Sequence, residues 1–492
     1  MASEAGTILR HGWIYGIANI VNRAAGILLL PLYTLVLTPT EFGVYALVGV
    51  VGDLLAVMLM IGMNNAFTVV YLEQADESGR RRVVSTAVLG LGGAVTVLVA
   101  LAWPAGWAAS HAVFGDGDHA ELMALALGSV AVTALFELAL AYLRARKRSG
   151  ACLAVSFVKA VVLLGLNALF LLGLGLKVEG IFLANAAAFL GLGLGLAAAM
   201  LRDSGMGFSM PVLRTLVRLG LPYLPQSLLD IANNFVMRWL LNALLTTAAV
   251  GLFSFGMRLA VLLYMLLTAS FLQIWSVRRL ESRHEAVDPA QARLVFHLFV
   301  VLLSAAAAGM ALVGPELVWL TASPDYAPVV ACLPFLVLAY VLHGVRMHPE
   351  VDLMKAQRMG VLPWISAASL VVGTGLAVAL VVRWGVMGAA LANLGREVFQ
   401  LAVTVAVRRR LCPGDEPLRV ARLAAILLPG MAVVAAGMLL FGDAVNPVFT
   451  AAKVGLTGLF VLAAVLGPGV GADGRAVLFP LLSGLVRRPR VA

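Results

Sequence analysis

The sequence predicts an all-α polytopic membrane protein with about 14 transmembrane helices. Hydrophobic residues make up 62% of its 492 residues and charged residues 12%, whereas a soluble domain has roughly 25% charged residues. The apolar residues form long runs joined by short loops, and most basic loop residues fall in every second loop. Water is therefore not the main solvent of the folded chain.

Each apolar run is long enough to cross a bilayer as one helix, because a hydrocarbon core of about 30 Å needs roughly 20 helical residues. The first run is too long for a signal peptide and lacks a small-residue cleavage site, so we expect it to stay attached. In chain order the predicted spans are 12–37, 42–71, 83–114, 120–143, 151–176, 180–201, 214–243, 247–276, 293–318, 324–347, 360–382, 386–407, 420–441 and 447–467.

The basic residues of the loops predict the orientation of the chain. One set of alternate loops carries clusters such as 80–82, 144–148 and 408–410, whereas opposite loops such as 115–121 and 321–326 contain no Lys or Arg. Because cytoplasmic loops are enriched in these residues, both termini are predicted to be cytoplasmic. The net charge of +10 suits a face turned to anionic lipid headgroups, so membrane lipids are expected partners and nucleic acid is not.

Several kinds of chemistry lack the residues that they need. Cys152, Cys332 and Cys412 are far apart and the seven histidines show no metal-ligand spacing, so no metal and no cofactor are expected. The chain has no GxxxxGK[ST] loop, and no nucleophile, base and orienting group recur together. We therefore predict neither catalytic residues nor ATP hydrolysis by this chain.

A weak internal repeat relates the first two predicted spans to the seventh and eighth. Residues 17–23 and 42–47 resemble residues 231–238 and 250–255, and Arg23 matches Arg238. Such repeats are common in secondary transporters, whose substrate sites lie between the halves near the middle of the membrane.

The repeat predicts a division of the chain into two six-helix lobes and two additional helices. The connector 202–218 is basic and alternates apolar with basic residues, which predicts an amphipathic helix on the cytoplasmic surface; a solvated linker is the alternative. The expected divisions are an N-terminal lobe at 1–205, a C-terminal lobe at 206–412, and two further spans with a basic cytoplasmic tail at 413–492.

Ionisable residues inside the spans are the most informative residues, because a charge at the bilayer centre costs on the order of 3 kcal/mol. Seven basic residues outnumber four acidic ones, so pairing within the protein leaves positive charge over, and an anionic ligand is the simplest missing partner. The basic residues are Arg23, Lys159, Arg238, Arg258, Arg346, Arg396 and Lys453, and the acidic residues are Asp53, Glu137, Asp230 and Glu397.

Polar residues line one face of two spans at matching places in the halves. Asn19 and Arg23 are four residues apart, as are Asp230, Asn234 and Arg238, so each set shares a helical face. Guanidinium groups offer planar forks of donors that suit phosphate oxygens. Arg23, Arg238 and Arg258, with the two asparagines, are therefore the predicted contacts for a phosphate or pyrophosphate; the alternatives are that Arg238 pairs with Asp230 and Arg258 with Asp53.

Other charged residues have weaker claims to the site. Lys159 and Arg396 are further candidate substrate contacts, but either can extend toward the cytoplasm or pair locally, and Arg346 and Lys453 are expected to be surface anchors. Intramembrane carboxylates act as proton relays in pumps, so the candidate groups for coupling to a proton or sodium ion are Asp53, Glu137 and Asp230. Glu137 alternatively stabilises a nearby arginine.

Two stretches of the sequence resemble a known family. Residues 30–45, Leu-Pro-Leu-Tyr followed by Leu-Thr-Pro-Thr-Glu-Phe-Gly-Val-Tyr, and residues 220–275 are similar to the openings of the two halves of bacterial polysaccharide transporters, the Wzx-type oligosaccharide flippases. These belong to the multidrug/oligosaccharidyl-lipid/polysaccharide (MOP) superfamily, which also holds the MATE-like exporters. Met237 stands where family members often carry Asp, and no proline follows Trp275.

The resemblance implies a MOP/MATE-like fold and movement of a lipid-linked oligosaccharide, carried on polyprenyl pyrophosphate, to the outer leaflet of the bacterial cell membrane. It also implies a glycan polymerase and glycosyltransferases as partners. Two other readings stay open: a flippase for a peptidoglycan-precursor lipid, and a cation-coupled multidrug exporter of the same superfamily, for which an acidic cavity is expected. A membrane-embedded glycosyltransferase is disfavoured, because no outer loop is long enough.

Overall fold

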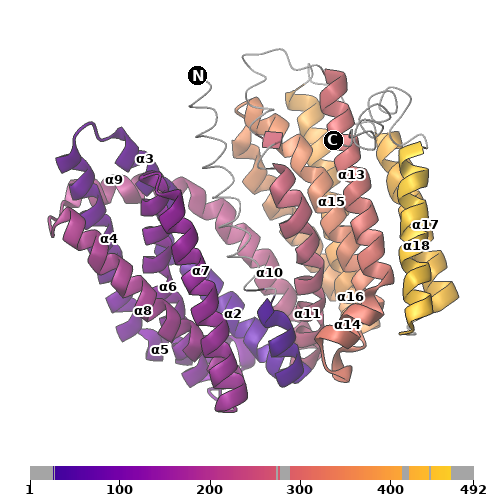
Figure 1. The fold of residues 1–492 in the computed structure, drawn as a ribbon, viewed down its shortest axis with the longest axis horizontal. Helices are drawn as coiled ribbons and strands as arrows, with labels where there is room; N and C mark the ends of the chain where they lie inside the picture. Colours follow the sequence, from indigo (N-terminus) through magenta and orange to yellow (C-terminus); the bar gives the residue numbers. More distant parts are fainter. Residues whose placement is uncertain are drawn as a thin grey trace, which may run out of the picture. The chain divides into compact units, whose positions relative to one another are not determined.

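A computed structural model describes residues 26, 28–272, 275–276, 289–412, 420–442 and 445–466. Within these ranges the chain is helical apart from short connections, and it forms two compact units, residues 1–251 and 252–492 (Figure 1). Eleven of the helices described are long and apolar enough to cross a membrane. The protein is thus an all-α, multi-pass membrane protein, as predicted, and the count of fourteen spans stays a prediction.

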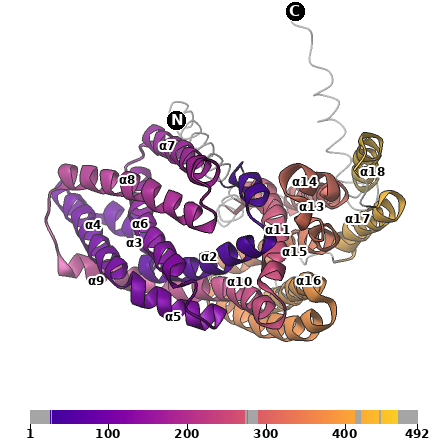
Figure 2. The ribbon, with the colours of Figure 1, turned by 90° about the horizontal axis from the view of Figure 1, so that it is seen from below.

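The first unit contains most of the helices of the N-terminal half. They are α2 (Pro39–Met60), α3 (Met63–Glu73), α4 (Glu77–Ala100), α5 (Ala102–Phe114), α6 (Ala120–Ala145), α7 (Ser149–Ala168), a π-helical turn (Leu169–Gly173), α8 (Val178–Ser204), α9 (Met210–Gly220), a 3-10 turn (Leu221–Tyr223) and α10 (Leu224–Leu244). Helix α6 is the most buried of them and packs against α8, α5, α2 and α4 (Figure 2).

The second unit contains the remaining helices. They are α11 (Thr247–Leu263), whose first residues belong to the first unit, a π-helical turn (Tyr264–Thr268), α13 (Pro289–Leu312), α14 (Gly314–Thr321), a 3-10 turn (Pro324–Tyr326), α15 (Val329–Lys355), a 3-10 turn (Met359–Val361), α16 (Leu362–Leu411), α17 (Val420–Phe441) and α18 (Pro447–Leu466). Helices α17 and α18 pack against each other and against α13 (Figure 2).

The predicted spans correspond broadly to these helices, although 42–71, 83–114 and 293–318 each contain two consecutive helices. The span 12–37 lies mostly outside the described residues. The spans 360–382 and 386–407 form the two arms of α16, which folds back at Gly385, where φ is 55° and ψ −132°. The predicted span 214–243 is wrong at its start, because residues 210–220 form the separate helix α9 and the following long helix begins at Leu224.

Helix α9 confirms the amphipathic helix predicted in the connector. Leu216 is fully buried against α3 and α4, and Leu213 lies over Gly90 of α4, whereas Arg214 and Arg218 are exposed. The period of about 3.6 residues per turn separates these two sets onto opposite faces. In Figure 1 the helix crosses the ends of α3 and α4.

The motif at residues 37–45 is a helix start followed by a close helix crossing. The hydroxyl of Thr38 accepts a hydrogen bond from the amide of Glu41 (3.3 Å), and the Glu41 carboxylate accepts one from the amide of Thr38 (2.9 Å), which makes a capping box ahead of α2. Gly43 then meets Gly251 of α11, and a Cβ atom added to Gly251 would lie 3.0 Å from the Gly43 amide nitrogen. Only glycine allows two helix backbones to approach this closely.

The same start recurs at α11, in the second half of the predicted repeat. The hydroxyl of Thr246 accepts a hydrogen bond from the amide of Ala249 (3.2 Å), as Thr38 does from Glu41, and Gly251 follows Thr246 at the distance at which Gly43 follows Thr38. The similarity between residues 42–47 and 250–255 therefore has a structural basis: these equivalent glycines contact each other.

A second repeated feature is the way in which α6 and α15 end. The amide of Arg148 donates a hydrogen bond to the carbonyl of Leu143 (3.0 Å), and the amide of Arg358 donates one to the carbonyl of Leu353 (2.9 Å). In each case the preceding residue has a left-handed backbone: φ is 55° at Lys147 and 58° at Gln357. This hydrogen-bond pattern is the Schellman motif, which usually has glycine at the left-handed position. The limits of the two predicted lobes stay a prediction.

Buried ion pairs join helices of the second unit. Arg408 of α16 donates to Asp352 of α15 from both its ε and η nitrogens (3.0 and 2.9 Å), and both side chains are almost completely buried. Lys453 of α18 pairs with Glu316 of α14 at 2.8 Å and is 1% exposed. The expectation that Lys453 is a surface anchor is wrong, because its ammonium group ends inside the helix bundle on a carboxylate.

We predict that Gly251→Ala lowers the melting temperature of the purified protein. The added methyl group overlaps the backbone of α2, and overpacking typically costs about 1–3 kcal/mol. Gly49→Ala in α2 is the matched control, because a Cβ atom there meets nothing within 4 Å and alanine favours a helix. An unchanged melting temperature in Gly251→Ala would show that the crossing is looser than described.

We also predict that Arg408→Met destabilises the protein by about 3–5 kcal/mol, because it leaves the Asp352 carboxylate buried without its partner. The double variant Asp352→Asn, Arg408→Met should recover much of this loss in thermal unfolding of the detergent-solubilised protein. Arg409→Met, which changes an exposed neighbour, is the control. A double variant no more stable than Arg408→Met would argue against the pair.

Candidate functional site

The polar stripe of α10 contains three of the predicted site residues, Asp230, Asn234 and Arg238. Asn234 donates to the carbonyl of Asp230 and Arg238 donates to the carbonyl of Asn234, both at 3.1 Å, and the Asp230 carboxylate accepts from Gln226, also at 3.1 Å. Asp230 and Asn234 are exposed and Arg238 is partly exposed. The stripe is thus a continuous polar ladder along one face of a membrane helix.

The face of α10 that packs into the first unit is apolar. Met237, Leu240 and Leu241 are buried, and the helix packs against α2. A polar face of this length is costly in contact with lipid, since each intramembrane polar or charged group needs water or a partner. The stripe therefore needs water or further polar partners on its exposed side.

The other arginines predicted for the phosphate site are placed differently. Arg23 and its neighbour Asn19 lie outside the described residues. Arg258 lies on the part of α11 that belongs to the second unit and is partly exposed; its chain neighbour Met257 accepts a hydrogen bond at its sulfur from Asn393 of α16 (3.8 Å). This part of α11 thus contacts the polar residue Asn393 of α16.

Lys159 lies among aromatic side chains of the first unit. Its ammonium nitrogen is 5.3 Å from the ring centre of Phe136 and 5.6 Å from that of Phe189, and among the described residues no carboxylate comes within 4 Å of it. Cation-π contacts of this kind are worth about 0.5–2 kcal/mol each. Because both rings belong to a buried cluster, the partly exposed lysine lies against the apolar core of this unit.

Arg396 is neutralised locally. Its guanidinium pairs with Glu397 (2.6 Å) and donates to Asn393 (3.1 Å) and Gln400 (3.3 Å), all on the same arm of α16. Local pairing, the alternative considered for this residue, is therefore what the structure contains. As a result Arg396 is a weaker candidate for binding an anion.

Arg346 completes a buried network with Arg396. It contacts Glu350 one turn later and lies 3.5 Å from Glu397, and it donates to Nδ1 of His343 at 2.7 Å. Nδ1 of His343 also lies 3.7 Å from Glu397, so the imidazole belongs to the same network. The expectation of a surface anchor at Arg346 is wrong, since the residue is 6% exposed and belongs to the interior of the second unit.

This network changes the predicted charge balance. The count of seven basic to four acidic residues left out Glu316 and Glu350, which partner Lys453 and Arg346, so three of the seven basic residues are neutralised inside the second unit. The sequence held a signal for one of these pairs, because Glu350 follows Arg346 by four residues. These three cations therefore need no anionic ligand to neutralise them.

The predicted coupling carboxylates lie on three helices of the first unit. Asp53 is exposed on α2, Glu137 is partly buried on α6, and Asp230 is exposed on α10. Among the described residues no group of three or more His, Cys, Asp or Glu side chains is arranged to hold a metal ion. The coupling role of these carboxylates stays a prediction.

The likeness to solved structures concerns the fold. The lipid II flippase MurJ in an inward closed conformation matches with a TM-score of 0.73 and 12% identity over 96% of this chain and 100% of that chain. An inward-facing multidrug resistance MATE family transporter of the MOP superfamily matches with a TM-score of 0.65 and 15% identity over 82% of this chain and 96% of that one. A MOP superfamily transporter from Pyrococcus furiosus Vc1 (DSM3638), whose binding pocket is described as reversed in polarity, matches with a TM-score of 0.55 and 14% identity. The match covers 80% of this chain and 94% of that one.

The family is shown by the sequence. No curated protein matches the chain. The profile of the family described as "Polysaccharide biosynthesis protein" matches residues 8–275, more than half of the 492 residues, and this segment includes the capping box of α2, the paired glycines and the stripe of α10. The chain therefore belongs to the polysaccharide biosynthesis protein family, and it has the fold of the MOP superfamily transporters.

Proposed function

We propose that this protein is a flippase that moves an oligosaccharide linked to polyprenyl pyrophosphate from the cytoplasmic to the outer leaflet of the bacterial cell membrane. The observation that carries the proposal is the polar stripe of α10, which ends in Arg238 and lies within the segment that matches the polysaccharide biosynthesis family. Both termini are cytoplasmic in this proposal, as the basic loops predict.

Arg238 has the chemistry that a pyrophosphate requires. Its guanidinium presents several N–H donors in a plane and keeps its charge at any physiological pH, so it can bind two phosphate oxygens together. One donor is engaged with the carbonyl of Asn234, which aligns the guanidinium along the stripe. Asn234 and Asp230, which precede Arg238 on α10, extend the polar face along which sugar hydroxyls can form hydrogen bonds.

The residues proposed to bind the anion in the first unit are Arg238 and Asn234, and Arg23, Asn19 and Arg258 stay candidates from the sequence. Lys159, Arg396, Arg346 and Lys453 have protein partners and are not needed for anion binding. A small set of arginines binds an anion without holding it too tightly to release, which a transport cycle by alternating access demands. Glycosyltransferases would supply the substrate and a glycan polymerase would consume it.

The likeness in fold to a lipid II flippase supports a related alternative, in which the carried lipid is a peptidoglycan precursor. Both substrates contain a polyprenyl pyrophosphate, so the same arginines would serve either. The two are separated by complementation: restored surface glycan in a glycan-flippase deletion strain supports the proposal, whereas restored growth of a lipid II flippase depletion strain supports the alternative. Drug resistance without either effect would indicate a multidrug exporter.

We predict that Arg238→Ala abolishes export of the surface glycan while the protein still reaches the membrane, because the pyrophosphate loses its planar donor pair. Arg238→Lys should retain only part of the activity, since lysine keeps the charge and loses the fork. Export is measured by surface glycan staining and the protein by immunoblotting of membranes.

Arg383→Ala is the matched control for Arg238→Ala, because it removes an exposed arginine that belongs to α16 and not to the stripe. A normal amount of surface glycan in Arg238→Ala cells would exclude this residue from the substrate site and contradict the proposal.

Asp230 is the proposed coupling carboxylate that belongs to the polar stripe of α10, and Asp53 and Glu137 are the other candidates. We predict that Asp230→Asn makes flipping in proteoliposomes insensitive to an imposed proton or sodium gradient, because the amide cannot take up the ion. Transport by Asp230→Asn that still responds to the gradient as the unchanged protein does would exclude Asp230, and Asp53→Asn and Glu137→Gln are then compared in the same assay.

A further inference from the structure

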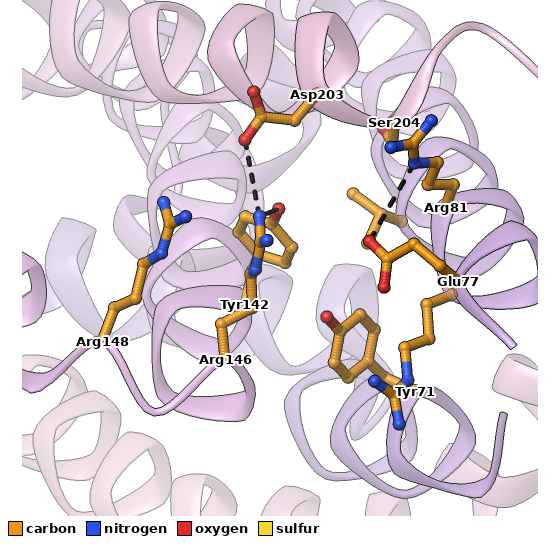
Figure 3. A pocket seen from close by; sticks show the side chains of 10 residues that line it. Tyr71, Glu77, Arg81, Tyr142, Arg146, Arg148, Asp203 and Ser204 are labelled. Carbon is orange, nitrogen blue, oxygen red and sulfur yellow. Dashed lines mark hydrogen bonds and ion pairs between the residues drawn. The ribbon is translucent and has the colours of Figure 1, made fainter. Parts of the chain in front are cut away.

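A polar cavity of about 290 Å³ opens at one end of the first unit, among the ends of α3, α4, α6 and α8 (Figure 3). By the distribution of basic loop residues this end is the one predicted to face the cytoplasm. The charged residues that line the cavity are Glu77, Arg80, Arg81, Arg146, Arg148 and Asp203.

The four arginines outnumber the carboxylates of the cavity. Arg81 lies 3.9 Å from Glu77, and Arg146 lies 3.5 Å from Asp203. Among the described residues no carboxylate comes within 4 Å of Arg80 or Arg148. In Figure 3 Arg148 stands at one side of the cavity with no ion pair drawn, so the space carries net positive charge.

The backbone and two tyrosines hold these guanidinium groups in place. The Schellman motif at residues 143–148 fixes the chain on both sides of Lys147, so that Arg146 and Arg148 both line the cavity. Arg146 donates to the hydroxyl of Tyr142 at 2.6 Å, and the guanidinium of Arg80 lies over the ring of Tyr71, 5.7 Å from its centre. A cationic site that is arranged before binding loses little entropy when a ligand enters.

The matching helix end in the second unit is closed instead of open. There the Schellman motif at residues 353–358 adjoins the pair of Asp352 with Arg408, in which one carboxylate and one guanidinium neutralise each other in the interior. The last residue of this motif is Arg358, which is exposed and matches Arg148, so an arginine at this position is common to both helix ends. The first unit differs because Arg80, Arg81 and Arg146 join this arginine around an open cavity.

The surroundings of the cavity are those of a membrane surface. The segment that follows Ser204 exposes three large apolar side chains, Met206 (76%), Phe208 (50%) and Met210 (55%), and leads into the amphipathic helix α9 with its exposed arginines. Exposed apolar groups next to basic ones are typical of segments that lie at the boundary of headgroups and acyl chains. A ligand in the cavity is thus at the depth of lipid headgroups.

We propose that this cavity binds the phosphate group of an anionic membrane lipid of the cytoplasmic leaflet. Arg148 and Arg80 supply donors that the protein itself does not neutralise, and Arg146 supplies a donor that the phosphate shares with Asp203. The phosphoryl anion is the chemistry that the site recognises, and a soluble phosphate compound is the other possible source of it. The inference stands apart from the substrate stripe of α10 and does not depend on what the protein transports.

The experiment compares lipid retention by the full-length protein reconstituted in vesicles of equal parts phosphatidylglycerol and phosphatidylcholine. Bound lipids are counted by native mass spectrometry after extraction. Arg146→Gln combined with Arg148→Gln should lower the retention of phosphatidylglycerol by roughly tenfold or more, because each arginine near the surface contributes to binding an anionic lipid. Arg409→Gln combined with Arg410→Gln removes the same charge from the exposed end of α16 and should leave this tightly bound lipid in place.

Asp203→Asn tests the proposal even if the double variant misfolds. It keeps every arginine and removes the carboxylate that competes for Arg146. It should raise the retention of phosphatidylglycerol. Equal retention in the two double variants, or no gain in Asp203→Asn, would overturn the proposal. Titration of the detergent-solubilised protein with inorganic pyrophosphate distinguishes a lipid phosphate from a soluble one. If the Arg146, Arg148 double variant loses pyrophosphate binding but retains phosphatidylglycerol unchanged, the cavity binds a soluble phosphate and the lipid assignment is overturned.

Discussion

The need to neutralise charge in a medium that contains little water shapes the interior of this protein. An isolated ionised side chain inside a bilayer is costly, so each one must meet an opposite charge, an aromatic face or water. In the second unit the solution is pairing: Arg346, Arg396, Arg408 and Lys453 all end on carboxylates of neighbouring helices or turns. These pairs link α15 with α16 and α14 with α18. They include most of the ionisable residues that lie inside the predicted spans of the second unit.

The first unit handles its polar groups in another way. Lys159 is placed among aromatic rings, while the residues Asp230, Asn234 and Arg238 form a ladder on the accessible face of α10. We propose that a charged substrate meets the protein at this accessible polar face. The contrast between a paired interior and an accessible stripe is the physical basis for assigning substrate contact to α10 and not to the network around Glu397.

The two halves are built with the same local devices. A threonine caps α2 and another begins α11, each is followed at the same spacing by a glycine, and the two glycines lie against each other. Helices α6 and α15 end in the same left-handed turn. Backbone features of this kind survive when side chains diverge, because they depend on glycine, on capping hydroxyls and on chain direction. The two halves differ in charge, with a closed ion pair at one helix end and an open arginine-lined cavity at the other.

Much of the fold could be predicted from the sequence because hydropathy is a local property. Long apolar runs, basic loops and the Thr-Pro-x-Glu start of α2 determined the class of the protein, most of its helices and its family resemblance without any knowledge of packing. What only the tertiary structure decided is which charges meet. Asp352 and Arg408 are 56 residues apart in the chain, and Glu316 and Lys453 are 137 apart, so no spacing rule connects them. Helix packing brings such groups together, and electrostatic pairing depends on distances of a few ångströms that a linear sequence does not contain.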